Sequence, residues 1–195
     1  ELPPMDGAAR AECVLALYPV LEAELKDKGM DNLYSTVELP LCPVLYDMEK
    51  EGVAIDRQML LRFGDMLTQR IDACEKLIYS YSGEPFNIQS PKQLGTVLFQ
   101  QLGLPPVKKT KTGYSTNADV LEKMKDKHPI VPAIMDYRML TKLKSTYAEG
   151  LLKQIGPDGR IHTTLQNMVT ATGRLSSTEP NLQNIPVRTD LGAEI

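Results

Sequence analysis

The sequence is poor in the residues that most often carry metal or nucleophilic chemistry. Its three cysteines, Cys13, Cys42 and Cys74, are odd in number and widely separated, so we expect free thiols in a reducing compartment instead of a disulfide or a metal site. The two histidines, His128 and His162, stand in no ligand spacing, and no Cys–His or Ser–His–Asp arrangement is indicated. We therefore expect no catalytic residue, no metal and no cofactor in this chain.

Long apolar runs are also lacking. No stretch of 18 apolar residues is present, which excludes a membrane-spanning helix, and no segment has the pattern of a secretory signal peptide. With 42% hydrophobic and 24% charged residues, the composition is typical of a soluble protein. The chain begins at Glu1 and ends at Ile195, just after a helix is predicted to begin, so we expect it to be a piece of a longer protein.

Charge is distributed unevenly along the chain, although the net charge is only −3. Residues 1–60 contain five Lys or Arg against 12 Asp or Glu, whereas residues 101–150 contain nine against five. A basic segment within an acidic protein indicates a local site for a polyanion, and a solvated basic face is the alternative.

Apolar residues recur at helical spacing in four segments, 8–28, 37–51, 57–81 and 130–152. The third is the longest and follows Asp56, which is a good N-cap residue. Its apolar positions step by three or four residues as in a coiled coil, so it needs a partner helix, which we expect to be 130–152. We predict a mainly α fold, in which two long antiparallel helices carry a small helical tip and a short antiparallel β piece follows. The apolar positions of the third segment are Leu60, Phe63, Leu67, Ile71, Cys74, Ile78 and Tyr81.

The tip is predicted between the two long helices. Ser90, Pro91 and Gln93 form the signature of a helix start, with a cap, a first-turn proline and a capping-box partner. Residues 105–116 are a loop by composition, because they hold prolines, a glycine and several hydroxyl-bearing residues. Thr116 is the predicted cap of a second short helix.

After Gly150 the pattern changes from helical to extended. Residues 156–159 form a predicted turn, residues 160–164 a strand, and residues 169–172 its partner strand. The following stretch, 176–186, is rich in Ser, Asn and Pro and is predicted to be a loop.

Two features of the basic segment could bind phosphate. Arg138, Thr141, Lys142 and Ser145 share one helix face, and cations with short hydroxyl donors suit a phosphate backbone. The lysines, hydroxyls and glycine of the loop at 108–116 could also wrap a phosphate. A solvated helix face and a mobile surface loop are the alternatives.

The block at 170–177, Thr-Ala-Thr-Gly-Arg-Leu-Ser-Ser, followed by Glu-Pro-Asn-Leu-Gln-Asn-Ile-Pro at 179–186, resembles the palm-entry motif of family A DNA polymerases. Residues 137–147 resemble the second long helix of the family's thumb, and residues 109–117 resemble its thumb tip. The agreement follows the style of the bacterial members and spans nearly the whole chain.

Upstream, Glu38–Leu41 and Met48–Asp56 resemble the segment that joins an exonuclease-like domain to the thumb. The resemblance therefore divides the chain into the end of a 3′–5′ exonuclease-like domain at 1–36, the thumb at 37–150 and the start of the palm at 151–195.

The resemblance implies a template-directed DNA polymerase of replication and gap-filling repair, in which this part binds primer–template duplex DNA. The helix face at 138–145 would line the minor-groove side, and the tip would hold backbone further from the primer end. Arg174 would reach the minor groove near the primer terminus, and the amides at 181–184 would contact the template. The implied DNA-binding residues are Lys109, Thr110, Lys111, Thr112, Gly113, Ser115, Thr116, Asn117, Arg138, Thr141, Lys142, Ser145, Arg174, Asn181, Gln183 and Asn184.

The family's metal-binding aspartates and its nucleotide-binding helix belong to motifs downstream of these segments. The resemblance thus implies that Mg²⁺ and dNTP bind only in the full-length parent, and that this chain alone is inactive. It further implies a monomer in the bacterial cytoplasm, associated with the nucleoid and with no membrane partner.

One segment departs from the family pattern. Typical members have Phe-Asn-Gln-Thr where this chain has Leu-Gln-Asn-Met at 165–168, so Gln166 and Asn167 are left out of the expected site. A helical-hairpin scaffold that binds protein is the alternative function, although it does not explain the block at 170–186. A nuclease would need clustered acidic residues on a strand, which are not found. An RNA-polymerising relative is a closer rival, and the bacterial style of the tip argues against it.

Overall fold

The computed structural model describes residues 6–107, 109–110, 113–186 and 191–192. The chain divides into two compact units, one of residues 1–53 with 162–182 and the other of residues 54–161 with 183–195. Helices dominate the described residues and the strands are short, as predicted. Within these ranges, no helix is both long enough and apolar enough to cross a membrane.

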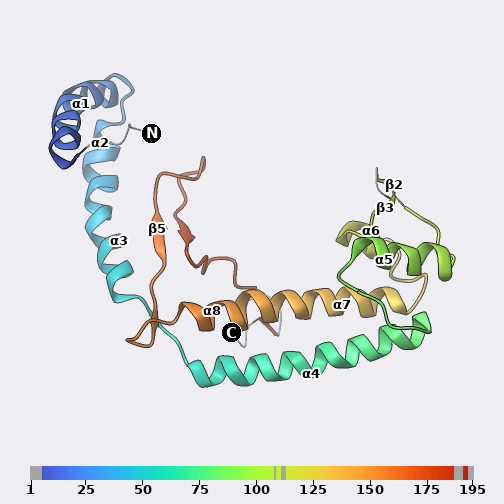
Figure 1. The fold of residues 1–195 in the computed structure, drawn as a ribbon. Helices are drawn as coiled ribbons and strands as arrows, with labels where there is room; N and C mark the ends of the chain where they lie inside the picture. Colours follow the sequence, from blue (N-terminus) through green and yellow to red (C-terminus); the bar gives the residue numbers. More distant parts are fainter. Residues whose placement is uncertain (1–5, 108, 111–112, 187–190, 193–195) are drawn as a thin grey trace. The chain divides into compact units, whose positions relative to one another are not determined.

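The second unit is built on a long helical hairpin. Helix α4 (Arg57–Ser82) runs antiparallel beside α7 (Ile130–Leu143), which continues through a π-helical turn, η3 (Lys144–Ala148), into α8 (Glu149–Gln154) (Figure 1). This pair confirms the predicted hairpin. Helix α4 begins where expected, because the Asp56 carboxylate accepts a hydrogen bond from the Met59 N–H at 2.9 Å.

The apolar seam of α4 faces α7 as its spacing predicts. Leu67 and Ile78 of α4 and Ile134 of α7 are fully buried. Near the far end, a Cβ built on Gly64 would lie 3.7 Å from the Cβ of Ala148, so small residues let the two helical segments approach closely. Each fully buried Leu or Ile is worth about 1.5–3 kcal/mol relative to exposure, so the seam holds the hairpin together.

The tip lies at one end of this hairpin and has its own helices, α5 (Pro91–Gly95), the π-helical η2 (Thr96–Gln101) and α6 (Ala118–Glu122) (Figure 1). Leu94 and Leu98 are fully buried and belong to the same apolar cluster as Ile78 and Ile134. Because the tip and the hairpin share this cluster, they form one packed body.

The tip corrects two predictions about helix starts. Ser90 caps α5, since its hydroxyl accepts from the Gln93 N–H at 3.4 Å, but the Gln93 side chain accepts from the Asn87 N–H instead of completing the capping box. The predicted cap of α6 was wrong by one residue. Asn117 caps α6 by accepting from the Val120 N–H at 3.1 Å, because the hydroxyl of the preceding threonine is engaged elsewhere.

The predicted loop at 105–116 contains a small β-hairpin. Strand β2 (Lys109–Thr110) pairs antiparallel with β3 (Gly113–Tyr114), with Lys109 opposite Tyr114 and Thr110 opposite Gly113. The pairing is supported by a tertiary contact that composition does not reveal, because the Tyr114 ring lies 5.0 Å from the Phe99 ring of η2. Lys108, Lys111 and Thr112 lie outside the described residues.

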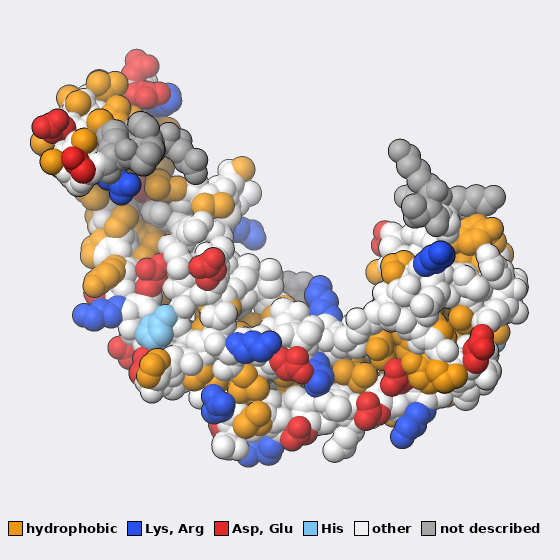
Figure 2. Space-filling view, in the orientation of Figure 1, with side chains coloured by type: hydrophobic (Ala, Val, Ile, Leu, Met, Phe, Trp, Pro, Cys, Tyr) orange, Lys and Arg blue, Asp and Glu red, His pale blue; other side chains and the backbone are white. Residues whose placement is uncertain are grey.

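The first unit begins with helices close to the predicted ones. They are α1 (Gly7–Asp27), α2 (Asp31–Leu33), the π-helical η1 (Tyr34–Glu38) and α3 (Leu39–Glu51). None of the residues of α1 is buried, so its apolar side chains lie on the surface of this unit (Figure 2). Gly52 ends α3 with a φ of 66°, which glycine adopts without strain.

The β piece is antiparallel, as predicted, but neither strand has the predicted bounds, because residues 160–161 form a separate strand and the paired strand begins only at Thr164. Strand β5 (Thr164–Gln166) pairs with β6 (Ser176–Thr178) and not with residues 169–172. Strand β6 lies in the stretch predicted to be a loop, where buried Ser177 bonds Thr163 at 2.6 Å between the two hydroxyls. This hydrogen bond satisfies the buried serine hydroxyl and so stabilises a strand in a serine-rich segment.

Two carboxylates of the first unit hold β5. Glu49 accepts from the Leu165 N–H at 2.6 Å, and Glu38 accepts from the Asn167 side-chain amide at 2.9 Å. Asn167, where the chain departs from the family pattern, is thus part of a local structural contact. The remaining short strands, β1 (Val53–Ala54) and β4 (Arg160–Ile161), lie near the predicted turn, where the Gly159 N–H donates to the Gly156 carbonyl at 3.0 Å.

Candidate nucleic-acid interface

The predicted phosphate-binding face of the 130–152 segment lines one hollow. All four side chains expected there border a depression of about 310 Å³ along α7 and η3. Two further residues complete its wall, and neither was predicted from the sequence to bind DNA. Gln89 comes from the chain before α5, so its approach to α7 depends on the fold of the tip and has no signal in local spacing. The lining residues are Gln89, Tyr137, Arg138, Thr141, Lys142 and Ser145.

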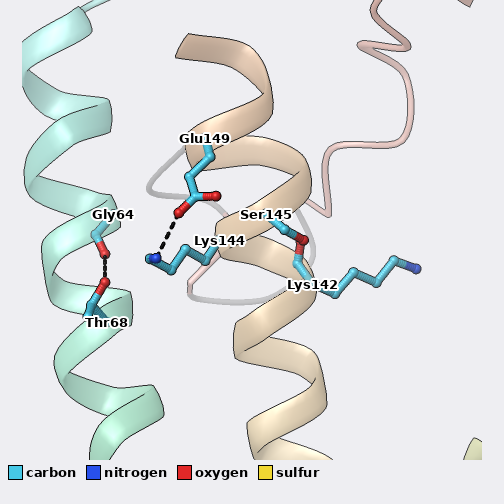
Figure 3. A network of polar contacts seen from close by, with 6 residues as sticks. All are labelled: Gly64, Thr68, Lys142, Lys144, Ser145 and Glu149. Atoms are coloured by element: carbon cyan, nitrogen blue, oxygen red, sulfur yellow. Dashed lines mark hydrogen bonds and ion pairs between the residues drawn. The ribbon is translucent and has the colours of Figure 1, made fainter. Parts of the chain in front are cut away.

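Lys142 is the exposed cation of this hollow. Its side chain extends away from α4, whereas Lys144 points toward α4 and pairs with Glu149 at 2.7 Å (Figure 3). In the part of the chain that the structure describes, Lys142 makes no ion pair. An exposed ammonium without a carboxylate partner is available to a phosphate at little desolvation cost.

Arg138 is half-buried and reaches across to the tip. Its Nη1 donates to the Thr116 carbonyl, and its Nη2 donates to the Thr116 hydroxyl at 3.3 Å. Burial lowers the pKa of the Arg138 guanidinium from its usual value, and an arginine still keeps its charge in a protein. The guanidinium therefore places a positive charge at the junction between α7 and the tip.

Thr141 contributes to the hollow a polar atom that is unsatisfied within the described structure. Its hydroxyl oxygen is buried and has no hydrogen-bond partner among the described residues. An unsatisfied buried hydroxyl costs about 1–3 kcal/mol. Such a group is retained at low cost only if a polar ligand or water meets it.

A second, larger hollow of about 750 Å³ lies on the tip. Its walls come from α5, η2, β3 and the link to α6, and Arg138 borders both this groove and the hollow on α7. Lys92 and Gln100, which the sequence analysis did not single out, line the wall on the α5 and η2 side. The full lining is Ser90, Pro91, Lys92, Gly95, Thr96, Gln100, Gly113, Tyr114, Ser115, Thr116, Asn117 and Arg138, which includes two cations and no acidic residue.

The other expected residues fall into both units. Lys109 and Thr110 form β2 in the tip, whereas Lys111 and Thr112 lie outside the described residues. The remaining four side chains are all exposed. Arg174 and Asn181 belong to the first unit, and Gln183 and Asn184 to the second.

Backbone contacts hold two of these residues in place. The Thr170 hydroxyl donates to the Arg174 carbonyl at 2.6 Å. The buried Tyr147 of η3 donates its hydroxyl to the Asn184 carbonyl. The segment with Gln183 and Asn184 is therefore tied to the same helical column as the α7 hollow.

Metal-ligating groups do not gather in the described ranges, where no set of three or more His, Cys, Asp or Glu side chains comes together. A two-metal centre needs such a set of side chains to hold its ions. What the described residues offer is a binding surface of cations, hydroxyls and amides.

Comparison with known proteins finds similar sequences among bacterial DNA polymerases. The chain is 50% identical over 187 residues to the DNA polymerase I of Bacillus subtilis, covering 95% of this chain and 21% of that protein. It is 56% identical over 161 residues to the DNA polymerase I of Caldicellulosiruptor bescii, covering 82% of this chain and 19% of that protein. The chain thus spans about a fifth of the length of these curated relatives.

Among solved structures, the POL domain of Pol1 from M. smegmatis, in complex with DNA primer-template and dNTP, matches with a TM-score of 0.86 and 45% identity. The match covers 95% of this chain and 33% of that one. The sequence profile of DNA polymerase family A matches residues 57–195, which include the helical hairpin, the tip and the block at 170–186. The chain belongs to DNA polymerase family A.

Proposed function

We propose that this chain is part of a template-directed DNA polymerase of replication and gap-filling repair, and that it binds the primer–template duplex DNA. The observation that carries the proposal is the hollow on α7, where four residues chosen by helical spacing line one depression. An ammonium, a guanidinium and hydroxyls side by side suit the phosphates and sugars of a duplex backbone. The M. smegmatis relative, which was solved with DNA primer-template, supports the same partner.

A polymerase must bind duplex DNA of any base sequence, and the side chains of the expected site are suited to such binding. Donors such as arginine and the side-chain amides bind minor-groove acceptors, which are nearly the same in every correct base pair. We assign this role to Arg174, Asn181, Gln183 and Asn184, and backbone contacts to the α7 face and to the tip residues 109–117.

Polymerisation itself belongs, in this proposal, to a longer protein. The chain spans about a fifth of its curated relatives, and its described residues hold no cluster that fits a pair of metal ions. We therefore assign Mg²⁺ binding to carboxylates, and dNTP binding to a separate helix, elsewhere in that protein. Within the chain, residues 1–36 would end an exonuclease-like domain, residues 37–150 would form the thumb, and residues 151–195 would begin the palm. The longer protein would be a monomer in the bacterial cytoplasm, associated with the nucleoid.

The test is a fluorescence-anisotropy titration of a labelled primer–template duplex with the 195-residue chain at several salt concentrations. We expect sequence-independent binding that weakens with salt by about 0.9 in log K per log salt for each phosphate contact. Lys142→Ala should weaken binding and reduce this slope by about one contact. Lys76→Ala, which removes an exposed lysine of α4 that lines neither hollow, is the matched control.

Equal losses in the Lys142→Ala and Lys76→Ala variants would mean that the chain binds DNA through diffuse charge and not through the α7 hollow. Absence of binding at the lowest salt concentration would contradict the proposal that this chain binds DNA by itself. A protein partner captured by the helical hairpin in place of DNA would instead favour the scaffold alternative.

A further inference from the structure

Arg138 joins two parts of the tip region that lie 22 residues apart in the sequence. It projects from α7, and Thr116, which accepts hydrogen bonds from both Nη1 and Nη2, lies between β3 and the Asn117 cap of α6. Thr116 is only 5% exposed, so its side of the contact is shielded from water. A single guanidinium thereby links the α7 helix to the segment that forms one wall of the tip groove.

The geometry of the contact requires an arginine. The guanidinium presents its N–H donors in a fixed planar fork, and here two of its nitrogens donate to the carbonyl and the hydroxyl of the same residue. A lysine ammonium at this position would be a single point charge on a flexible stem and would not reproduce the paired contact.

Arg138 is also well placed to act as an anchor. Its neighbours on α7, Tyr137 and Leu140, are 8% and 1% exposed, so the base of the side chain belongs to the packed hairpin. The tip segment is held from its other side by the Tyr114 ring, which packs at 5.0 Å on Phe99. The residues between these two contacts carry the Ser115 hydroxyl and the Asn117 amide of the groove.

We propose that Arg138 is a positioning residue, which acts through Thr116 to fix the segment 113–117 and so presents the tip groove to one strand of the duplex. This inference rests on the proposed function, and it replaces the direct phosphate contact assigned there to Arg138 with an indirect role. Lys142 and Ser145 contact the duplex at the α7 hollow, whereas Arg138 sets the tip groove at a fixed distance from that hollow. Loss of Arg138 should therefore weaken only duplexes long enough to reach the tip.

The experiment measures the affinity of the 195-residue chain for a series of duplexes shortened one base pair at a time. Arg138→Lys keeps the charge but removes the fork, Thr116→Val removes the accepting hydroxyl, and Lys142→Ala removes a contact of the α7 hollow. Affinity of the unmodified chain should rise in a step when the duplex reaches the tip. Arg138→Lys should lose that step, a reduction of about tenfold as expected for two hydrogen bonds, and keep the affinity for the shortest duplex.

Thr116→Val should reduce the same step by a smaller factor, because the carbonyl contact remains. Lys142→Ala should weaken short and long duplexes alike. If Arg138→Lys weakens the shortest duplex as much as the longest, Arg138 is a direct DNA contact and the proposal is overturned.

A second readout uses the DNA-free protein. Backbone amide hydrogen exchange at residues 113–117 should accelerate in Arg138→Lys, while exchange along α7 stays unchanged. Unchanged exchange at 113–117 would overturn the positioning role even if DNA binding falls. If no form of the chain binds DNA but exchange accelerates as expected, the proposed function fails and the positioning role of Arg138 stands.

Discussion

Lys142 and Lys144 are two residues apart in the same helical column, yet Lys144 points toward α4 and Lys142 points away from it (Figure 3). Residues at i and i+2 lie about 200° apart around a helix, so the two ammonium groups meet different surroundings. Lys144 pairs with Glu149 at 2.7 Å, whereas Lys142 borders the hollow on α7.

This difference predicts unequal effects on DNA binding. Lys142→Gln should lower duplex affinity and reduce the salt slope by about 0.9, the value for one phosphate. Lys144→Gln should leave both unchanged and shift the midpoint of urea denaturation only slightly, because an exposed ion pair contributes little to stability. Anisotropy at three salt concentrations and urea denaturation measure the two quantities. Equal salt slopes in the two variants would contradict the assignment of Lys142.

Thr141 predicts a conflict between stability and binding. Thr141→Val keeps the shape of the side chain and removes a buried hydroxyl that has no partner among the described residues, so it should stabilise the DNA-free protein by about 1 kcal/mol. The same change should weaken duplex binding if the ligand supplies the missing partner. Urea denaturation and anisotropy on the same samples test both effects.

Thr68 provides the matched control, because its hydroxyl donates to the Gly64 carbonyl at 2.9 Å (Figure 3). Thr68→Val should destabilise the protein by about 0.5–1.5 kcal/mol and leave binding unchanged. Destabilisation of similar size in Thr68→Val and Thr141→Val would show that the Thr141 hydroxyl has a partner in solution.

The α4 seam predicts a strong dependence of stability on burial within one helix. Leu67→Ala removes a fully buried side chain and should lower the free energy of unfolding by about 2–5 kcal/mol. Leu61→Ala removes the same atoms from a side chain that is 41% exposed and should cost far less. Chemical denaturation followed by circular dichroism compares the two, and similar losses would contradict the packing of α4 on α7.

Tyr79 predicts a loss of stability at high pH. Burial, with a further contribution from the adjacent Glu75, raises the pKa of Tyr79 to about 12 from 10.0. Because the folded pKa lies above the unfolded value, the contribution of Tyr79 is fully present below pH 10 and is lost as the pH rises through about 12. The Tyr79 hydroxyl donates hydrogen bonds to the Glu75 carboxylate at 2.8 Å and to the Phe86 carbonyl at 3.0 Å, which favours its protonated form.

Tyr79→Phe removes this titration. Its difference in unfolding free energy from the unmodified chain should be largest near pH 8 and shrink between pH 10 and pH 12. Denaturation at a series of pH values measures the difference, in which the titration of other tyrosines and lysines cancels. A difference that stays constant over this window would contradict the raised pKa.

The long helices were predictable because their signals are redundant. Leu60, Phe63 and Leu67 repeat the same spacing that Ile71 and Ile78 continue, so no single residue decides the result. The face at 138–145 was predictable for the same reason, since helical geometry alone places its side chains together. The predicted fold class, mainly α with two long antiparallel helices, is confirmed.

Short elements depend on contacts that sequence spacing does not contain. Thr116 and Asn117 are both good caps, and the choice between them follows from Arg138, which lies 22 residues from Thr116. Strand β6 similarly depends on the contact of Ser177 with Thr163. Gln89 reaches the α7 hollow only because the tip folds back on the hairpin.

In the proposed function, the π-helical turn η3 limits the length of duplex that the α7 face can contact. It begins at Lys144, two residues after Lys142, and the extra residue in its turn rotates the positions that follow. The stripe from Arg138 through Ser145 rises about 10 Å along the helix, which is the length of about three base-pair steps. If the α7 face binds a duplex as proposed, an advance of the duplex by one base pair would exchange about a third of these contacts, and rotatable ammonium and hydroxyl groups would allow this without release of the rest.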